Sequence, residues 1–354
     1  MMQMKFKMIF NTPAFLGDAE RKGAMRSPPI KALIRHFWRI EAAKSPSVDY
    51  DSSKLREEEG RLFGHASLKE NNDSWAMSSQ VRIKLEAWEA KMIEKSLPGA
   101  GQVYHKEVGQ GGMYVDASLY LGYGPVGLKS KLNFEKAIAP GKDGGTKLSI
   151  AFPNEQEKPL SNTFKLIQAF GTIGGRSRNG WGSVCLDGEG LPDAFSLLKN
   201  SAFISAHSRP LHSCLEKDWP HAIGLDGEER ALIWTTKQPR RSWTEVIKDL
   251  AEIKVAFRTA LPFRGGSGPM EKRHVLAYPA GQRHKVHAWK NEARLPNQLR
   301  FKVIEHPKDR FRGIAFHIPC AIPEDLGKTT FSLKEQMDVW KEVHKNLDQL
   351  MLRI

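Results

Sequence analysis

The stretch Phe170-Gly171-Thr172-Ile173-Gly174-Gly175-Arg176-Ser177-Arg178-Asn179-Gly180-Trp181-Gly182-Ser183 connects a predicted helix to a predicted strand. Before it, Ser161 is a candidate cap for a helix in which Phe164, Ile167 and Phe170 recur at helical spacing. Residues 183–186, which follow, have the composition of a strand. Five glycines allow the backbone of residues 171–182, the glycine-rich loop, to take positive φ or to approach another group closely. The loop therefore separates the second helix from the last strand of a folded module.

The residues before this loop predict the other elements of the module. Residues 4–10 alternate as a strand does, and Ser27 is a candidate cap for a helix that follows. Residues 81–87 and 148–152 alternate in the manner of two more strands. The order strand, helix, strand, strand, helix, strand matches a ferredoxin-like module, here with long insertions such as the glycine-rich residues 99–130.

The second half of the chain repeats this order less completely. A strand is predicted at residues 231–236, and Ser242 with Glu245 forms a capping box for the next helix. A hairpin is predicted within residues 299–318, and a capping box that starts at Ser332 begins the last helix. We recognise no final strand after that helix.

These patterns predict an α+β protein built from two ferredoxin-like (RRM-like βαββαβ) domains with long insertions. A chain of 354 residues is also long for one hydrophobic core. We assign residues 1–190, with the glycine-rich loop, to the first domain and residues 191–354 to the second. The boundary falls within residues 187–230, where Gly, Pro and Asp accumulate.

The charge of the chain indicates a polyanionic partner. Lys and Arg number 54 against 40 Asp and Glu, so the formal net charge is +14, which makes nucleic acid the first partner to consider. No run of about 18 apolar residues exists to cross a membrane, and the first ten residues lack the apolar core of a signal peptide. We therefore expect a cytoplasmic protein with no membrane partner. Three cysteines far apart in the sequence predict neither a disulfide framework nor a metal knuckle.

Two sequence features are candidates for contact with phosphate. In the glycine-rich loop, successive amides can form an anion-binding nest, and Arg176 and Arg178 add donors suited to phosphate. In the first predicted helix, Lys31, Arg35 and Arg39 lie four residues apart and form a basic stripe beside Trp38. A mobile surface turn and a solvated helix face are the structural alternatives. Three further basic residues stand just before this helix: Arg21, Lys22 and Arg26.

A second basic region runs from Arg264 to Lys302 and includes Tyr278 and Trp289, an interleaving of charge and aromatic residues that is typical of single-stranded RNA binding. Residues 122–127 spell GxGxxG, but Pro125 removes an amide that a dinucleotide-binding turn needs. We interpret them as a structural or RNA-facing loop.

Candidates for catalysis are few, and we expect no enzyme activity, cofactor or metal. His36 is a candidate general base for metal-independent RNA cleavage, with a solvated surface histidine as the alternative. Four residues contain zinc-ligand atoms, but their spacing fits no standard site: His207, His212, Cys214 and His221.

Five segments carry a resemblance to a known family: Thr12 to Gly17; Arg26 to Lys31 with Arg35, Trp38 and Arg39; Leu62-Phe63-Gly64; Ser79 to Leu85; and Tyr120 to Gly124. In these residues and their spacing, the chain resembles the first-subunit family of type III-B CRISPR (Cmr) effector complexes. The glycine-rich loop with Ser183 resembles the signature of the wider RAMP superfamily, which often has a further basic residue where this chain has Asn179. The second half of the chain matches only in architecture.

The resemblance implies paired RAMP-type ferredoxin-like folds and a place in a ribonucleoprotein with other Cmr subunits. In that family the assembly holds a CRISPR RNA and recognises complementary target RNA, and the resemblance implies a position near the 3′-end of the guide for this subunit. It also implies that target cleavage belongs to another subunit. A CRISPR RNA-processing endoribonuclease of the same superfamily, using His36, is the alternative. The predicted RNA-binding residues are Arg26, Lys31, Arg35, Trp38, Arg39, Gly174, Gly175, Arg176, Arg178 and Asn179.

Overall fold

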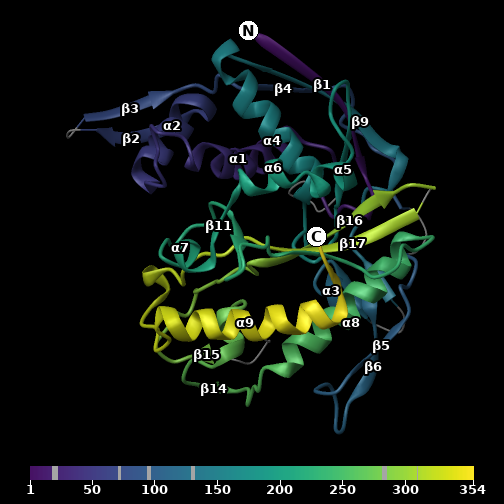
Figure 1. Ribbon diagram of the computed structural model, residues 1–354. Coiled ribbons are helices and arrows are strands. Elements are labelled where there is room, and N and C mark those ends of the chain that lie inside the picture. The colour runs from purple at the N-terminus through teal and green to yellow at the C-terminus, as the bar shows by residue number, and fades with distance from the viewer. Residues whose placement is uncertain (18–22, 71–72, 94–96, 129–131, 281–284, 309) are drawn as a thin grey trace. The chain divides into compact units, whose positions relative to one another are not determined.

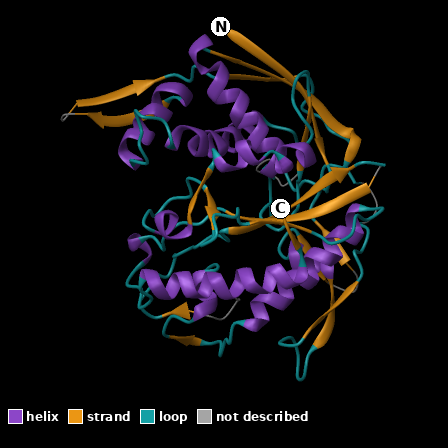
Figure 2. Ribbon diagram, viewed as in Figure 1, coloured by secondary structure: helices purple, strands orange, loops and turns teal. Residues whose placement is uncertain are grey.

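The structure is a computed structural model of residues 1–354, and it describes all of them except 18–22, 71–72, 94–96, 129–131, 281–284 and 309 (Figure 1). The chain divides into two compact units. The first unit contains residues 1–97, 133–177 and 181–200. The second contains residues 98–132, 178–180 and 201–354. Both units mix helices and strands (Figure 2), so the predicted α+β class is confirmed.

The first unit contains the following helices and strands: β1 Met2–Phe10, α1 Ser27–Ala43, α2 Ser52–Phe63, β2 His65–Glu70, β3 Asp73–Met77, β4 Arg82–Leu85, β9 Gly141–Phe152, η1 Asn154–Gln156, α4 Glu157–Phe170, β10 Val184–Asp187 and α5 Ala194–Lys199. The short strand β8, Leu132–Phe134, lies where the chain passes between the units.

Four strands of the first unit form one antiparallel sheet in the order β10-β1-β9-β4. Strand β1 lies between β10 and β9, and its apolar side chains Phe6, Met8 and Phe10 are buried. Helices α1 and α4 pack against each other, and Phe164 of α4 lies 4.7 Å, between ring centroids, from Phe6. The sheet strands and these two helices follow one another in the predicted order.

Two of the predicted helix caps were wrong. Ser27 is the first residue of α1, and no side chain caps that helix. Helix α4 begins at Glu157, one turn before Ser161, because Pro159 fits the first turn of a helix and does not interrupt it. By contrast, the capping boxes that begin at Ser242 and Ser332 are confirmed.

The second unit contains the following helices and strands: β5 Gln102–His105, β6 Met113–Asp116, α3 Ala117–Gly122, β7 Val126–Leu128, α6 Ser201–Ser205, β11 Ser208–Pro210, α7 Leu211–Leu215, β12 Ile223–Leu225, β13 Ile233–Thr235, α8 Trp243–Ala260, β14 Ser267–Gly268, η2 Lys272–Val275, β15 Lys285–Val286, β16 Leu299–His306, β17 Arg310–His317, η3 Glu324–Leu326, α9 Leu333–Leu350 and β18 Leu352–Arg353.

Four strands of the second unit form a sheet in the order β16-β17-β13-β18, which is also antiparallel. Helices α8 and α9 lie side by side on this sheet (Figure 1). The final strand, which the sequence did not reveal, is β18. It has only two residues, too few for an alternating pattern, and Arg353 pairs with Trp234 of β13.

Residues 98–132, which we assigned to the first domain, belong to the second unit. Strands β5 and β6 form a hairpin, and α3 packs on α8. The cause is apolar burial: Val103, Ala117 and Leu121 share a core with Leu250. The chain leaves the first unit after residue 200, inside the predicted boundary region.

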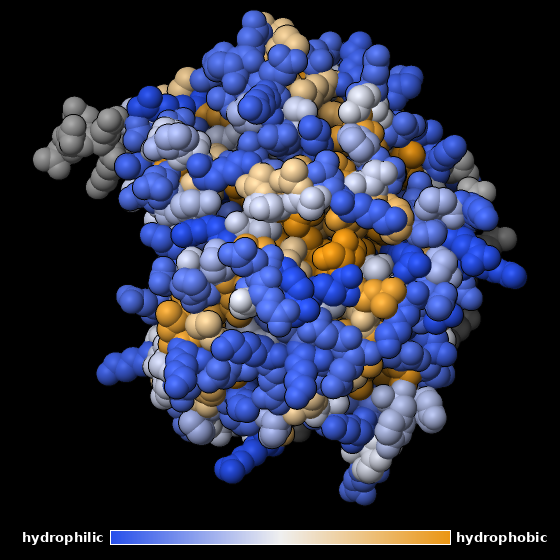
Figure 3. Space-filling view, viewed as in Figure 1, coloured by the Kyte–Doolittle hydropathy of each residue, from blue (hydrophilic) through white to orange (hydrophobic). Residues whose placement is uncertain are grey.

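Hydrophilic residues cover most of the face drawn in Figure 3. Within the part of the chain that the structure describes, no helix combines the length and the apolar character that crossing a membrane requires.

The buried histidines of the second unit include His221, His317 and His344. Burial lowers the pKa of His221 to about 4 and that of His344 to about 3. Burial and the neighbouring His344 also lower the pKa of His317 well below its ordinary value. Nδ1 of His317 and Nε2 of His344 share a hydrogen bond of 3.0 Å. The folded chain therefore holds these rings neutral.

We expect the free energy of unfolding to fall as the pH is lowered below about 6.5, where histidines of the unfolded chain take up protons. Above that pH the neutral histidines contribute fully to the free energy of unfolding. Below it, each buried histidine lowers the free energy of unfolding by about 1.4 kcal/mol per pH unit until the pH reaches its pKa in the folded chain. Urea denaturation between pH 7 and pH 5 measures the loss. The variant His344→Gln should show a shallower pH dependence than the wild type, and equal slopes would contradict this account.

Candidate nucleic-acid interface

The basic stripe (Lys31, Arg35 and Arg39) lies on α1 beside one buried carboxylate. Nε of Arg35 is 2.7 Å from Oε1 of Glu59, and Nη2 of Arg39 is 2.8 Å from the same oxygen. The Glu59 side chain is only 7% exposed, whereas those of the two arginines are 39% and 40% exposed. One carboxylate thus orients two guanidinium groups and neutralises one of them. With Lys31 included, two positive charges remain.

Lys31 is a third cation of the basic stripe and is repelled by the neighbouring charge of Arg35. Partial burial, and next the charge of Arg35, lower the pKa of Lys31. An anion bound beside the stripe would relieve the repulsion between these cations. The geometry therefore favours a ligand with several negative charges.

Trp38, predicted to bind RNA, is buried in the first unit. Its ring meets the ring of Phe63 nearly edge to face, with centroids 5.4 Å apart. The indole is part of the core, and its face is not available to a nucleotide.

The start of α1 and the glycine-rich loop contact the same short segment, residues 15–17. A guanidinium N–H of Arg26 donates a hydrogen bond to the carbonyl of Gly17. From the loop, the amide of Gly175 donates to the carbonyl of Phe15 at 2.9 Å. The fold thus brings Arg26 to the segment that holds the loop. Arg21 and Lys22 lie outside the described residues.

The glycines of the loop allow close backbone approach. Gly174 has φ +91°, and a Cβ there would lie 2.7 Å from the carbonyl oxygen of Phe15. Gly182 has φ +60°, and a Cβ there would collide with the carbonyl of Ile173. The amide of Gly182 donates to Pro13 and that of Ile173 donates to Gly182, both at 2.9 Å. A side chain at either glycine would open this packing.

The predicted anion nest in this loop is not formed as expected. The amides of Gly175, Ser177 and Gly182 donate to backbone carbonyls, so these N–H groups are occupied. Arg176, in contrast, is exposed, and its φ is +55°. The cation that the loop presents to solvent is therefore the side chain of Arg176.

Arg178 and Asn179, also predicted to bind RNA, pack within the second unit. A guanidinium N–H of Arg178 donates to the carbonyl of Asn297 at 3.2 Å, and burial lowers the pKa of this arginine. Asn179 is buried. Nδ2 of its side chain donates to the carbonyl of Leu121 at 2.8 Å, and its Oδ1 accepts a hydrogen bond from Nζ of Lys254 at 2.7 Å. Both side chains therefore make structural contacts within the second unit.

The second basic region is not the predicted array of exposed aromatic rings. Tyr278 and Trp289 are buried and meet edge to face, with centroids 4.7 Å apart. Nε1 of Trp289 donates to the carbonyl of Lys328 at 3.1 Å. These rings fill the core of the second unit because their apolar area is large.

The residues considered for catalysis or zinc form no such centre among the described residues. His36 is half-buried next to Phe37, and no described group of three or more His, Cys, Asp or Glu can hold a metal ion. His221 lies 3.0 Å from the guanidinium of Arg209, which would compete with a cation. Burial raises the pKa of Cys214 to about 12, so that its thiol stays protonated.

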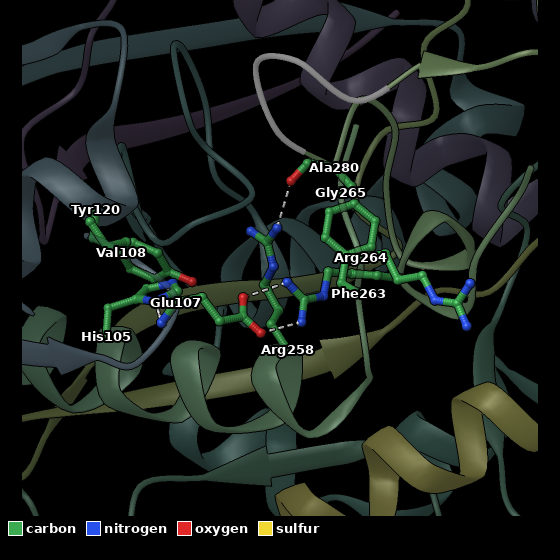
Figure 4. A pocket seen from close by; sticks show the side chains of 10 residues that line it. His105, Glu107, Val108, Tyr120, Arg258, Phe263, Arg264, Gly265 and Ala280 are labelled. Carbon is green, nitrogen blue, oxygen red and sulfur yellow. Dashed lines mark hydrogen bonds and ion pairs between the residues drawn. The ribbon is translucent and has the colours of Figure 1, made fainter. Parts of the chain in front are cut away.

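A cavity of about 390 Å³ in the second unit is the feature that the sequence did not predict (Figure 4). Residues distant in the sequence line it: they come from the β5–β6 hairpin, α3, the last turns of α8, the loop that follows α8, η2 and Ala280. Its polar lining residues are His105, Glu107, Tyr120, Arg258, Arg264 and Arg273. No spacing rule connects these segments, so only the tertiary structure reveals the cavity.

One ion pair organises the cavity. Nη1 and Nη2 of Arg273 donate to the two carboxylate oxygens of Glu107 at 2.6 and 2.7 Å. The hydrogen bonds from Arg273 lower the pKa of Glu107. Arg258 donates to the carbonyl of Ala280 at 2.9 Å, and Figure 4 shows its side chain directed toward that carbonyl.

Comparison with known proteins identifies a family. The family model described as the RAMP superfamily matches residues 7–185. Among the curated proteins, none matches the sequence of this chain.

Three solved structures resemble this chain. The crystal structure of Cmr1 from Pyrococcus furiosus (apo form) has 14% sequence identity over 98% of this chain and 97% of that chain, with a TM-score of 0.46. A chain in the cryo-EM structure of the Type III-B Cmr-beta bound to cognate target RNA has 11% identity over 98% and 99%, with a TM-score of 0.49. A chain in a second Cmr-beta structure, bound to cognate target RNA and AMPPnP (state 2) in the presence of ssDNA, has 12% identity over 97% of this chain and 98% of that chain. Its TM-score is 0.40.

The contacts of Asn179 predict a structural effect for its substitution. Asn179→Ala removes two buried hydrogen bonds, one of them to a lysine ammonium, and should lower the free energy of unfolding by about 1.5–3 kcal/mol. Arg176→Ala, in the exposed part of the same loop, is the control and should change it by less than about 0.5 kcal/mol. Urea denaturation measures both. Equal effects of the two substitutions would show that Asn179 has no such role.

Proposed function

Because the chain belongs to the RAMP superfamily, we propose that it is a non-catalytic, RNA-binding subunit of a type III-B CRISPR (Cmr) RNA-guided effector complex. The observation that carries this proposal is the basic stripe on α1, where two arginines share one buried carboxylate and leave positive charge at the surface. In this proposal the stripe follows the phosphate backbone of the guide or target RNA. The complex acts in the cytoplasm, with other Cmr subunits as partners.

The topology of both units supports the RAMP-type architecture in this proposal. In the first unit, the chain order β1-α1-β4-β9-α4-β10 gives the sheet order β10-β1-β9-β4. In the second, the order β13-α8-β16-β17-α9-β18 gives β18-β13-β17-β16, which is the same arrangement. We infer that each unit is a ferredoxin-like module, with residues 98–132 inserted in the first and packed with the second.

The assignment to the Cmr assembly rests on the five sequence segments, of which four belong to the first unit and residues 120–124 belong to the second. Residues 13–17, part of the first segment, hold the glycine-rich loop and the start of α1. Arg35 and Arg39 belong to the second segment. The resemblance also implies a position near the 3′-end of the guide RNA.

The proposed interface consists of the predicted residues that are exposed or half-buried in the first unit. They are Arg26, Lys31, Arg35, Arg39, Gly174, Gly175 and Arg176. Guanidinium groups bind phosphate oxygens bidentately, so contacts at these residues fix the RNA backbone without reading its sequence. Base pairing between guide and target then supplies the specificity.

The RNA-binding proposal predicts a change in salt dependence. We expect the triple variant Lys31→Ala, Arg39→Ala, Arg176→Ala to bind single-stranded RNA more weakly. The slope of log K against log salt concentration should fall by about 0.7 per lost phosphate contact, or about 2 in all. Arg35 is retained so that Glu59 keeps an ion pair. Fluorescence anisotropy over a range of salt concentrations measures the slope.

The matched control removes three exposed cations elsewhere in the first unit, Lys54→Ala, Arg56→Ala and Lys158→Ala. If both triple variants lower the slope equally, the effect belongs to net charge and the interface is contradicted. The same holds if the slope of the first variant is unchanged.

The absence of catalysis is tested separately. Purified chain incubated with CRISPR repeat RNA in EDTA should leave the RNA intact, because we assign the described residues no acid–base pair for its cleavage. Gel electrophoresis of the RNA checks this. Cleavage that disappears in His36→Ala would instead identify a metal-independent endoribonuclease.

A further inference from the structure

The cavity in the second unit has more positive charge than its own residues neutralise. It is lined by three arginines, Arg258, Arg264 and Arg273, but by one carboxylate, that of Glu107, which binds Arg273. Neither Arg258 nor Arg264 forms an ion pair with another described residue. Glu271, which does not line the cavity, accepts the backbone amide of Arg264 at 2.9 Å. The lining residues therefore have two uncompensated positive charges.

Two buried groups of this cavity donate no hydrogen bond to a described residue: the O–H of Tyr120 and Nε–H of Arg273. The guanidinium of Arg258 lies near the oxygen of Tyr120, to which it can only donate. Burial raises the pKa of Tyr120, so its hydroxyl keeps its proton at neutral pH. A buried donor without a partner costs about 1–3 kcal/mol, which a ligand that accepts hydrogen bonds would recover.

His105 contributes a neutral donor. Burial lowers its pKa, against the opposing effect of Glu107. The amide of Glu107 donates to Nδ1 of His105 at 3.3 Å, so the proton of the neutral ring is on Nε2. The cavity therefore offers N–H and O–H groups from several directions, while its one carboxylate is occupied by Arg273.

The size of the cavity indicates more than a single ion. A volume of about 390 Å³ lies within the roughly 300–1,000 Å³ of small-molecule sites. Apolar atoms of Val108, Phe263 and Tyr120 form part of the wall. One nucleotide has this combination of an anionic end and a flat apolar body.

We propose that this cavity binds a nucleotide through its phosphate monoester, presented by the end of an RNA strand or by a free mononucleotide. A phosphate monoester has a charge of about −1.5 to −2 and three acceptor oxygens, which match two uncompensated cations and a set of donors. An internal phosphodiester has a single negative charge and matches less well. The site is separate from the basic stripe and goes beyond the proposed function.

The test uses the purified full-length chain and matched pairs of probes. The first pair is uridine monophosphate and uridine, and the second is one short single-stranded RNA with either a terminal phosphate or a terminal hydroxyl. The phosphorylated member should bind at least about tenfold more tightly, the value of a hydrogen bond to a charged group. A preference in the RNA pair alone identifies a strand end, and one in the uridine pair alone identifies a free nucleotide.

Two variants and one control test whether the preference for the phosphorylated probe arises in the cavity. Tyr120→Phe should reduce the preference for the phosphorylated probe roughly tenfold with little change in the melting temperature, because the O–H of Tyr120 donates no hydrogen bond to a described residue. Arg258→Ala should abolish it. Arg241→Ala removes one exposed cation of the same unit outside the cavity and should leave it unchanged.

Equal affinity for phosphorylated and unphosphorylated probes in the wild type would overturn this inference, as would a preference that survives in both Tyr120→Phe and Arg258→Ala. The outcome is distinguishable from failure of the proposed function. A chain that binds RNA without preference for a phosphate end contradicts only the cavity site. A chain that prefers uridine monophosphate but binds no RNA contradicts only the proposed function.

Discussion

Backbone packed directly against backbone, between the glycine-rich loop and residues 13–17, is the constraint on which the rest of the first unit depends. Gly174 and Gly182 approach the carbonyls of Phe15 and Ile173 so closely that a Cβ would collide or strain the contact. This approach lets the amides of Gly175 and Gly182 bond to that segment. The glycines thus fix the loop in place, and the exposed Arg176 is positioned as a consequence.

The same segment also fixes the start of α1, through the hydrogen bond from Arg26 to Gly17. Farther along the helix, Glu59 holds Arg35 and Arg39 in one orientation. A buried carboxylate is favourable only with a charged partner, and here it has two. An ion pair that is part of the fold therefore also prepares the surface that we assign to RNA.

The sequence predicted those features that depend on local pattern. The sequence correctly predicted the sheet strands of both units apart from β18, the helices α1, α4, α8 and α9, the capping boxes at Ser242 and Ser332, and membership in the RAMP superfamily. Strand β18 was missed because two residues have no periodicity. The position of residues 98–132 was wrong because the partner of their apolar face, α8, lies more than one hundred residues later in the chain.

The candidate sites show the same limit. The basic stripe is visible in the sequence because its cations recur every four residues of a predicted helix. No pattern reveals that Trp38, Tyr278 and Trp289 are buried, since aromatic side chains can either fill a core or stack on a nucleobase. The cavity around Arg258 needs residues from separate segments and left no sequence signal. Asn179 is comparable: its neighbours in the sequence indicated RNA, whereas its contacts are with Lys254 and Leu121.

The central claim is that RNA lies along the basic stripe of α1. Ultraviolet crosslinking of RNA within the assembled effector complex, mapped to peptides by mass spectrometry, tests it most directly. Our account predicts crosslinked peptides from residues 26–39 and from the exposed part of the glycine-rich loop near Arg176. Crosslinks confined to other parts of the chain, with these peptides recovered unmodified, would contradict it.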